Sequence, residues 1–426
     1  MNKINSVLKE ALKKVKPSGK EAGEIEILLK KFTERLRKSI KNLGVDAEIF
    51  VGGSVAKGTS IKKKVYDADI FLRFNRKYED ISNLTEKILK GFKKTKIHGS
   101  RDYFRIKASR KIVLEIVPVL RIKSPKEARN ITDLSYFHVN YAKRKFPKKI
   151  IDEIILAKAF CHAKNCYGAE SYIRGFSGYG LELLVYHYKS FLNFLKAISK
   201  PSLNSGNQEK IIIDTEKKFR NKNEILMDVN SSKLQSPVIL IDPTHRERNA
   251  LAALSWETFR KFQKAGRKFL KKPSIRDFEK EKTDIEKIKK TAEKNKNEFI
   301  LLKAETKKQE GDIAGSKLLK FYNYLTDEIK NNFHLKKYGF QYNEDKSALY
   351  FFVAGKGKEI LNKGPIIKDK KNFQKFRKKH KKTFIKEGRI YSKKKAEVNL
   401  GNFLKKWKGK NAKRMKDMHI SYLKNV

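Results

Sequence analysis

The sequence predicts an α/β, or α+β, protein of several domains. Three observations lead to this prediction: a length of 426 residues, a first part that mixes strand and helix patterns, and a middle part that is mostly helical. At roughly 100–200 residues per domain, the length suggests two to four domains. We expect boundaries near residues 130 and 273, which gives a first domain at 1–130, a helical central domain at 131–273 and a basic α+β region at 274–426.

The first domain is expected to combine a long helix with a sheet. In residues 19–43 apolar side chains recur at spacings of three and four, as in an amphipathic helix, and Gly44 follows as the expected C-cap. A second helix is expected at 83–93. Short runs rich in β-branched and aromatic residues predict three strands, at 47–51, 66–74 and 111–120. Such a mixture is typical of α/β and α+β domains.

The central domain is predicted to be mostly helical. Pro147 marks a helix start, and residues 180–197 and 250–270 show helical periodicity. Residues 279–298 are almost all polar, which predicts a solvated helix or a linker. The following stretch, 299–355, is expected to be α+β. Its elements are a strand at 299–303, a helix at 315–332 and a strand at 348–353.

The chain is extremely basic. It contains 101 Lys and Arg against 47 Asp and Glu, a formal charge of +54, and Lys356–Val426 alone holds 25 basic and 5 acidic residues with aromatics interleaved. Such a charge needs a polyanion or costs self-repulsion. Lysines far outnumber arginines, as an AT-rich genome would also produce. Nucleic-acid binding and codon bias both stay open as explanations.

Several classes of protein are excluded. No apolar run approaches the roughly 18–20 residues that a membrane span needs, so no membrane partner is expected. Met1–Lys16 has basic residues throughout and no apolar core, unlike a signal peptide. Cys161 and Cys166 are the only cysteines, too few for a disulfide framework or a four-cysteine zinc site. These features predict a soluble, cytoplasmic protein.

The strongest chemical pattern lies in the first domain. A predicted strand is followed by Gly52-Gly53-Ser54, then by Asp67 and Asp69 on a second strand, and by Glu115 on a later one. Side chains alternate along a strand, so Asp67 and Asp69 face the same side. Neighbouring carboxylates raise each other's pKa unless a cation separates them. The expected cation is Mg²⁺, which prefers oxygen ligands and shares itself with phosphates.

The glycine-rich turn suits a triphosphate. It offers close backbone approach, free N–H groups and the Ser54 hydroxyl, and Lys57 adds a positive charge one turn on. Alone, an Asp-x-Asp pair is common on solvent-facing strands, and Gly-Gly-Ser is an ordinary turn. The combination is more specific, with 12 residues between Ser54 and Asp67 and a further acid on an apolar strand. It resembles the polymerase-beta-type nucleotidyltransferase superfamily.

Further sequence motifs indicate one family within this superfamily. They are similar to archaeal class I CCA-adding enzymes, which are tRNA nucleotidyltransferases, in order and spacing from about residue 20 to 270 and more weakly beyond. The blocks are Asp133-Leu-Ser-Tyr-Phe-His138, Lys158, Tyr167-Gly-Ala-Glu170, Arg174-Gly-Phe-Ser-Gly-Tyr179, Asp242-Pro-Thr244 with Arg248-Asn249, and Lys363-Gly-Pro365 with Phe373 and Phe376.

The resemblance implies roles for nine residues. Asp67, Asp69 and Glu115 would be the catalytic carboxylates and hold two Mg²⁺ ions. One ion would activate the tRNA 3′-hydroxyl, and the other would bridge the triphosphate. The nucleotide-binding residues would be Ser54, Lys57, His138, Lys158, Tyr167 and Arg248. Ser54 and Lys57 would hold the triphosphate.

Two of these residues depart from the family's pattern. Glu115 stands where the third carboxylate is commonly Asp, and Lys57 stands where Arg is frequent, so a bidentate phosphate contact is lost there. Other residues have structural alternatives. His138 alone could be an ordinary core or surface histidine, and Tyr167 could serve packing only.

The implied reaction adds CTP, CTP and then ATP to the 3′ end of tRNA without a template and releases pyrophosphate. Arg248 would help to select CTP and ATP, and the basic C-terminal region would bind the tRNA acceptor stem by phosphate and shape. The sequence leaves the oligomeric state open, with a homodimer among the options. Two alternatives remain: a poly(A) polymerase-like RNA nucleotidyltransferase, and a non-catalytic RNA-binding protein with a retired transferase fold.

Overall fold

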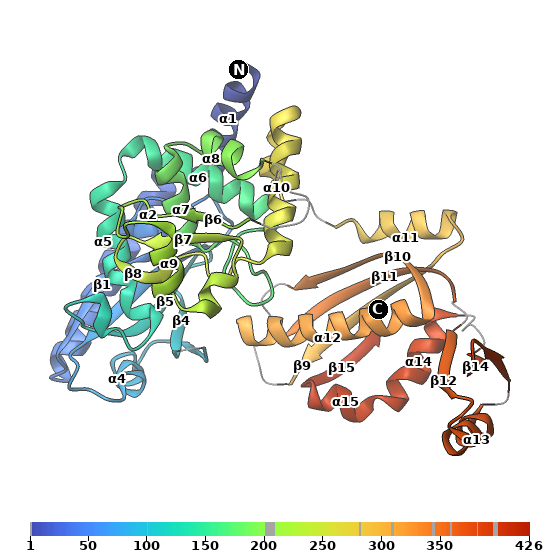
Figure 1. Cartoon of the computed structure of the whole chain (residues 1–426). Coiled ribbons are helices and arrows are strands. Elements are labelled where there is room, and N and C mark those ends of the chain that lie inside the picture. Colours follow the sequence, from blue (N-terminus) through green and yellow to red (C-terminus); the bar gives the residue numbers. More distant parts are fainter. Residues whose placement is uncertain are drawn as a thin grey trace. The chain divides into compact units, whose positions relative to one another are not determined.

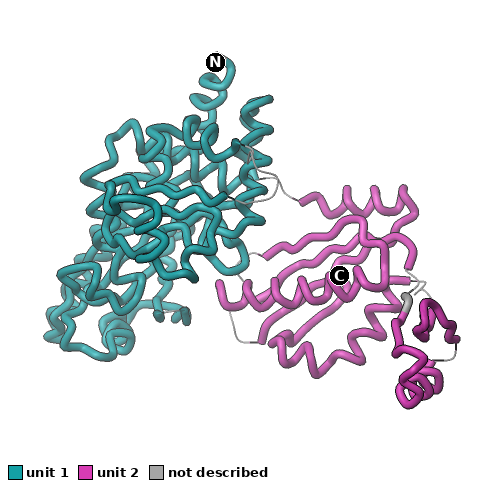
Figure 2. The backbone as a smooth tube through the Cα atoms, viewed as in Figure 1, with its two compact units in different colours: residues 1–281 teal, residues 282–426 magenta. Residues whose placement is uncertain are grey.

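The structure is a computed structural model that separates into two compact units, residues 1–281 and 282–426 (Figures 1 and 2). The expected division into three domains stays a prediction. The residues described are 2–99, 101–200, 209–280, 283–307, 311–342, 346–357, 360–380, 382–394 and 399–426.

The first unit contains a five-stranded mixed sheet. Its strand order is β1 (Ala47–Val51), β2 (Tyr66–Phe74), β5 (Ile112–Leu120), β4 (Tyr103–Lys107) and β3 (Thr95–Ile97). The three predicted strands are confirmed, whereas the β3–β4 hairpin was not predicted. β2 and β5 run parallel, and every other neighbouring pair is antiparallel. Apolar residues of α2 (Gly19–Asn42) and α4 (Ile81–Ile88) form one core with this sheet.

The predicted long helix is confirmed as α2, and local chemistry explains both of its ends. The Ser18 hydroxyl accepts a hydrogen bond from the Glu21 N–H, and the Glu21 carboxylate accepts one from the Ser18 N–H, which makes a capping box. Gly44 has a φ of +60°, the left-handed conformation that commonly ends a helix.

A second core of the first unit is helical (Figure 1). It is built by α6 (Lys148–Ala163), α7 (Gly178–Tyr188), α8 (Phe191–Ile198) and α10 (Trp256–Lys271), with α1 (Asn2–Val15) packed on α6 through Ala11. Helix α5 (Ser135–Lys145) precedes it. The helical stretch predicted at 180–197 is confirmed as two helices, because Lys189 has a φ of +66° and Ser190 caps a new helix.

The helical part also carries a small sheet that was not predicted. Its strands are β6 (Ile211–Ile213), β7 (Val238–Asp242) and β8 (His245–Asn249), with α9 (Lys222–Asp228) nearby in sequence. Short single turns complete the first unit: α3 (Gly53–Ala56) and 3₁₀ turns at Pro125–Glu127, Ile131–Leu134, Ser231–Gln235 and Ile275–Phe278.

The second unit is built on a four-stranded antiparallel sheet. The strand order is β10 (Phe333–Tyr342), β11 (Ser347–Gly357), β9 (Glu298–Thr306) and β15 (Ile420–Asn425). One face packs on α12 (Gly311–Asn332) and α14 (Leu400–Lys410), and the other packs on α11 (Ile285–Lys294). Alternate residues of β9 serve the two faces: Ile300 and Leu302 belong to the first core, and Leu301 to the second. Helix α15 (Ala412–Asp417) precedes β15.

A small basic sheet lies between β11 and α14 in sequence. It consists of β12 (Ile360–Ile366), β14 (Arg389–Lys394) and β13 (Thr383–Lys386), with α13 (Lys370–Lys379) between β12 and β13 in the chain. None of the residues of α13 is buried. The helices of the described residues include none long and apolar enough to cross a membrane.

Candidate active site

Three carboxylates lie on one face of the first sheet. The parallel pairing of β2 with β5 sets Asp69 opposite Glu115, and Asp67 is two residues before Asp69 on the same strand. Their neighbours Ala68 and Leu114 point the other way, into the core shared with α2 and α4. The alternation of buried and accessible residues along both strands therefore holds the acids on the accessible face.

The carboxylates are close enough to perturb one another. Burial, followed by the charges of Glu115 and Asp67, raises the pKa of Asp69 to about 7, and the charges of Lys57 and Lys63 oppose this rise. The three carboxylates thus repel one another in a partly buried site. A bound cation would relieve this repulsion.

Two of the acids have basic partners in this structure. Asp67 accepts a hydrogen bond from Lys63 Nζ at 3.2 Å, and Glu115 accepts one from Arg105 Nε at 2.7 Å. Within the described ranges, no three His, Cys, Asp or Glu side chains already form a metal cage. The donors are all carboxylate oxygens, which suit a hard divalent ion such as Mg²⁺. The site therefore fits such an ion by its chemistry.

The Gly-Gly-Ser turn lies directly against these acids. Gly52 N–H donates to the carbonyl of Asp69 at 2.9 Å. Gly53 has a φ of +63°, and a Cβ there would overlap the Asp69 carboxylate; a Cβ at Gly52 would overlap the ring of Phe71. Only glycine lets the backbone approach β2 this closely. The turn continues into α3, which carries Ser54.

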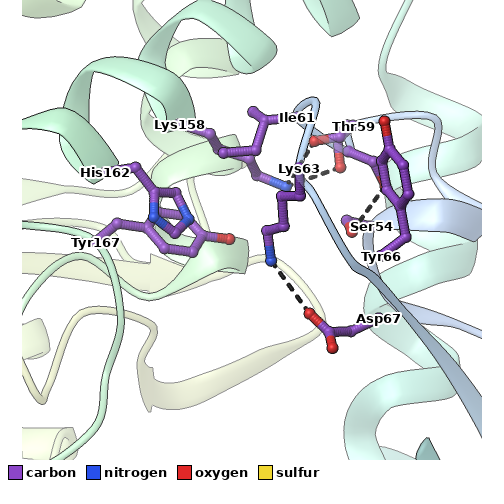
Figure 3. A pocket seen from close by; sticks show the side chains of 10 residues that line it. Ser54, Thr59, Ile61, Lys63, Tyr66, Asp67, Lys158, His162 and Tyr167 are labelled. Atoms are coloured by element: carbon purple, nitrogen blue, oxygen red, sulfur yellow. Dashed lines mark hydrogen bonds and ion pairs between the residues drawn. The ribbon is translucent and has the colours of Figure 1, made fainter. Parts of the chain in front are cut away.

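A pocket opens beside the turn (Figure 3). Among its lining residues are four of the predicted site residues, Ser54, Asp67, Lys158 and Tyr167. The ring of His162 stacks on Tyr167, with centroids 4.2 Å apart. His162 was not predicted, although it lies four residues after Lys158 and hence on the same face of α6. Burial, together with the charges of nearby lysines, lowers the pKa of His162 to about 3.

Lys57 and Lys158 meet on a buried acid that sequence reasoning missed. Glu182 of α7 accepts from Lys57 Nζ and from Lys158 Nζ, each at 2.6 Å, one on each carboxylate oxygen. Burial alone would raise the pKa of Glu182, but the charges of the two lysines lower it to about 2. The available clue was an acid inside the otherwise apolar run 181–185.

His138 and Arg248 meet on a second buried acid, Asp242 at the end of β7. Asp242 Oδ2 lies 2.9 Å from His138 Nε2 and accepts from Arg248 Nη1 at 2.5 Å. Tyr179 donates to the other oxygen at 3.2 Å. Burial opposes the charge on Asp242, yet these partners hold its pKa well below the usual range. Burial lowers the pKa of His138, and the hydrogen bond and charge of Asp242 oppose this shift.

Tyr179 connects the two buried acids. It lies on α7 one turn before Glu182, its ring stacks on His138 with centroids 4.1 Å apart, and Lys57 Nζ is 5.8 Å from the ring centre. His138 and Arg248 are not among the lining residues of the pocket in Figure 3. Lys57, Lys158, His138 and Arg248 thus gather around α7, with Tyr179, Glu182 and Asp242 as additional members.

The chain matches two family models and several curated proteins. Residues 152–279 match the family described as "tRNA nucleotidyltransferase, second domain". Residues 1–135 match the "Second Messenger Oligonucleotide or Dinucleotide Synthetase domain". The chain is 36% identical over 355 residues to the CCA-adding enzyme of Nanoarchaeum equitans, covering 81% of this chain and 83% of that protein. The chain belongs to the CCA-adding enzyme family.

A second family member spans more of the chain. The CCA-adding enzyme of Methanocaldococcus jannaschii is 29% identical over 406 residues, which cover 91% of this chain and 87% of that protein. Among solved structures, a cytoplasmic RNA terminal U-transferase aligns with a TM-score of 0.50 at 14% identity, covering 66% of this chain and all of that one. At that identity the likeness shows a shared nucleotidyltransferase fold alone.

Proposed function

We propose that this chain completes tRNA by adding CCA to its 3′ end from CTP and ATP, without a nucleic-acid template, with release of pyrophosphate. The observation that carries the proposal is the arrangement of Asp67, Asp69 and Glu115 on paired strands against the Gly-Gly-Ser turn. This arrangement occurs in a chain of the CCA-adding enzyme family.

We infer that Asp67, Asp69 and Glu115 hold Mg²⁺ in the working enzyme. When bound, the ions would supply positive charge that makes the 3′-hydroxyl a better nucleophile and stabilises the leaving pyrophosphate. Asp67 and Glu115 would exchange their contacts with Lys63 and Arg105 for this ligation.

The other site residues would bind and orient the nucleotide. Ser54, Lys158 and Tyr167 line the pocket, and Lys57 joins Lys158 through Glu182, which supports a role for these four residues in holding the triphosphate. Arg248 and His138, which are held by Asp242, would contact the base of the incoming nucleotide and help to select it. Positioning and charge neutralisation carry most of phosphoryl-transfer catalysis, which agrees with so many fixed polar contacts.

The RNA partner would be tRNA, held at its acceptor stem and 3′ end. The basic second unit supports this choice, because its strands and α13 expose many lysines. The cytoplasmic location and the homodimer stay predictions. The retired-transferase and poly(A) polymerase-like alternatives are not favoured, because the matching curated relatives are CCA-adding enzymes.

A single experiment tests the proposal. The full chain is incubated with Mg²⁺ and tRNA that lacks its CCA end, with CTP, ATP, UTP or GTP singly and with CTP plus ATP. We expect two additions with CTP alone and three with CTP plus ATP, each accompanied by pyrophosphate. A long adenosine tail would favour the poly(A) polymerase-like alternative, and tRNA binding without pyrophosphate release would favour a non-catalytic protein.

A further inference from the structure

The starting point is an acid where a hydrophobic residue would be expected. Glu182 has no exposed surface, and its neighbours on α7, Leu181 and Leu183, belong to the helical core. A buried carboxylate without partners would be strongly destabilising. Here both oxygens are satisfied by Lys57 and Lys158, and Thr59 donates a further hydrogen bond at 2.7 Å. The acid is thus built into a complete polar network.

The network joins three segments that are distant in sequence. Lys57 and Thr59 follow the Gly-Gly-Ser turn, Lys158 comes from α6, and Glu182 comes from α7. Lys158 also donates to the Thr59 hydroxyl at 2.9 Å and to the Thr59 carbonyl at 3.2 Å. Glu182 therefore ties the turn that carries Ser54 to the helices of the second core.

The network forms part of the pocket wall. Thr59 and Lys158 line the pocket together with Ser54 and Asp67, and Figure 3 shows the Lys158 ammonium group directed at Thr59. Two ammonium groups and one carboxylate leave a net charge of +1 beside this opening. Without the carboxylate, two lysines that are less than a tenth exposed would repel each other and move apart.

We propose that Glu182 is a positioning residue for the triphosphate of the incoming nucleotide: it fixes Lys57, Lys158 and the Gly-Gly-Ser turn in one preformed anion-binding wall. This inference rests on the proposed function. Glu182 itself does not touch the substrate, since it is covered by its lysines. A preformed wall is favourable because binding then needs no further ordering of long lysine side chains.

The test compares Glu182→Gln with a matched control, Glu153→Gln. Glu153 is a partly buried acid on α6 that accepts the Phe191 N–H at 2.7 Å and does not line the pocket. For both full-length variants, the binding of tripolyphosphate and of CTP is measured in EDTA. The KM and kcat for CTP addition are measured in Mg²⁺, and Tm is measured without ligand. Thr59→Val is the second variant, because it removes one hydroxyl and no charge.

We expect Glu182→Gln to weaken tripolyphosphate and CTP binding about tenfold and to raise KM by a similar factor, with a smaller change in kcat. Thr59→Val should weaken binding about two- to fivefold, and Glu153→Gln should lower Tm with unchanged binding. A lowered Tm with unchanged binding in Glu182→Gln, or tighter binding, would overturn the proposal. If Glu182→Gln does not fold, unchanged binding in Thr59→Val would overturn it.

The measurements distinguish a failure of the proposed function from a failure of this inference. Tripolyphosphate binding is read without tRNA and without metal, so a wild-type chain that binds it but adds no nucleotide to tRNA would contradict the function alone. Weak binding in the wild type itself, at millimolar tripolyphosphate, would overturn the preformed wall while leaving CCA addition open.

Discussion

At the residue scale, the catalytic carboxylates should be separable from RNA binding. Asp69→Asn keeps the shape of the side chain and removes its charge, and we expect it to slow CCA addition by about 10³-fold or more, equivalent to about 4 kcal/mol of barrier. Binding of tRNA should stay near the wild-type level, because a positive protein loses only one negative charge. Gel-based addition and a binding titration measure the two effects.

The control for this substitution is Asp46→Asn. Asp46 precedes β1 and pairs with Arg121 at 2.7 Å, away from the acids on β2 and β5. The Asp46→Asn variant should add CCA at the wild-type rate. Near-normal turnover of Asp69→Asn would refute the role of Asp69 in holding metal.

His162 gives a prediction about acid stability. Its pKa is about 3 in the folded chain, below the ordinary value of 6.5, so between these values the unfolded chain binds more protons. The folded state therefore loses stability as the pH falls through this window. We expect His162→Gln to gain Tm relative to the wild type on going from pH 7.5 to pH 5. Parallel Tm profiles of the two proteins would show that His162 is not kept neutral by burial.

The sequence could predict some site residues and not others. Asp67 and Asp69 were expected on one face because alternation along a strand is a local property. The pairing of Asp69 with Glu115 depends on β2 and β5 being adjacent, which skips the β3–β4 hairpin. The contacts of Glu182 form only where three distant segments meet, so no local sequence pattern could predict them.

At the scale of elements, the Gly-Gly-Ser turn offers a matched pair of substitutions. Gly53 and Gly58 both have positive φ, +63° and +68°, but only Gly53 lies against Asp69, whereas Gly58 has nothing within 4 Å of a new Cβ. Each alanine should cost about 1–2 kcal/mol of stability through backbone strain, and Gly53→Ala should cost more because its Cβ also overlaps the Asp69 carboxylate. We expect Gly53→Ala, but not Gly58→Ala, to reduce the rate of nucleotide addition by about 100-fold or more, because the new Cβ displaces the Asp69 carboxylate.

Thermal unfolding and initial rates measure these two effects. Equal activities of the two glycine variants, measured below the Tm of both, would mean that the close approach of Gly53 to Asp69 has no functional consequence. Gly44→Ala is a further control, because Gly44 also has a positive φ and open space but lies at the end of α2.

Elements with long, regular periodicity were the most predictable, whereas among the described strands of five residues or fewer β1 alone was predicted. The helix α2 matches its expected range, because its buried apolar stripe runs from Ile25 to Ile40, about four turns, and both ends carry capping residues. The break between α7 and α8 depends on one residue, Lys189, in the left-handed conformation. The strands β6–β8 have three to five residues each, too few for periodicity to distinguish them from loops.

At the scale of the whole molecule, the charge of α13 distinguishes RNA binding from codon bias. Six exposed basic residues of this helix can be changed to Gln without touching a core: Lys370, Lys371, Lys375, Arg377, Lys378 and Lys379. If they neutralise tRNA phosphates, the variant should bind tRNA about tenfold more weakly at low salt. The slope of log affinity against log salt should also become shallower by about 1 or more.

The control neutralises four exposed lysines of α11, namely Lys287, Lys289, Lys290 and Lys294. Codon bias predicts small, similar losses for both sets, whereas a docking role predicts a loss confined to α13. Truncation at Lys356 would be a poor substitute for this test, because it removes α14 and β15, whose Phe403, Trp407 and Leu423 belong to the core of the second unit.

The sheet of the second unit has a consequence for how the chain folds. β9 is flanked by β11 and by β15, and Ile420 pairs with Thr306, 114 residues earlier. Contacts this distant in sequence carry a large loop-closure cost and slow the folding reaction. During synthesis one edge of β9 therefore stays open until β15 has emerged from the ribosome, and that edge is where mispairing with another chain would begin.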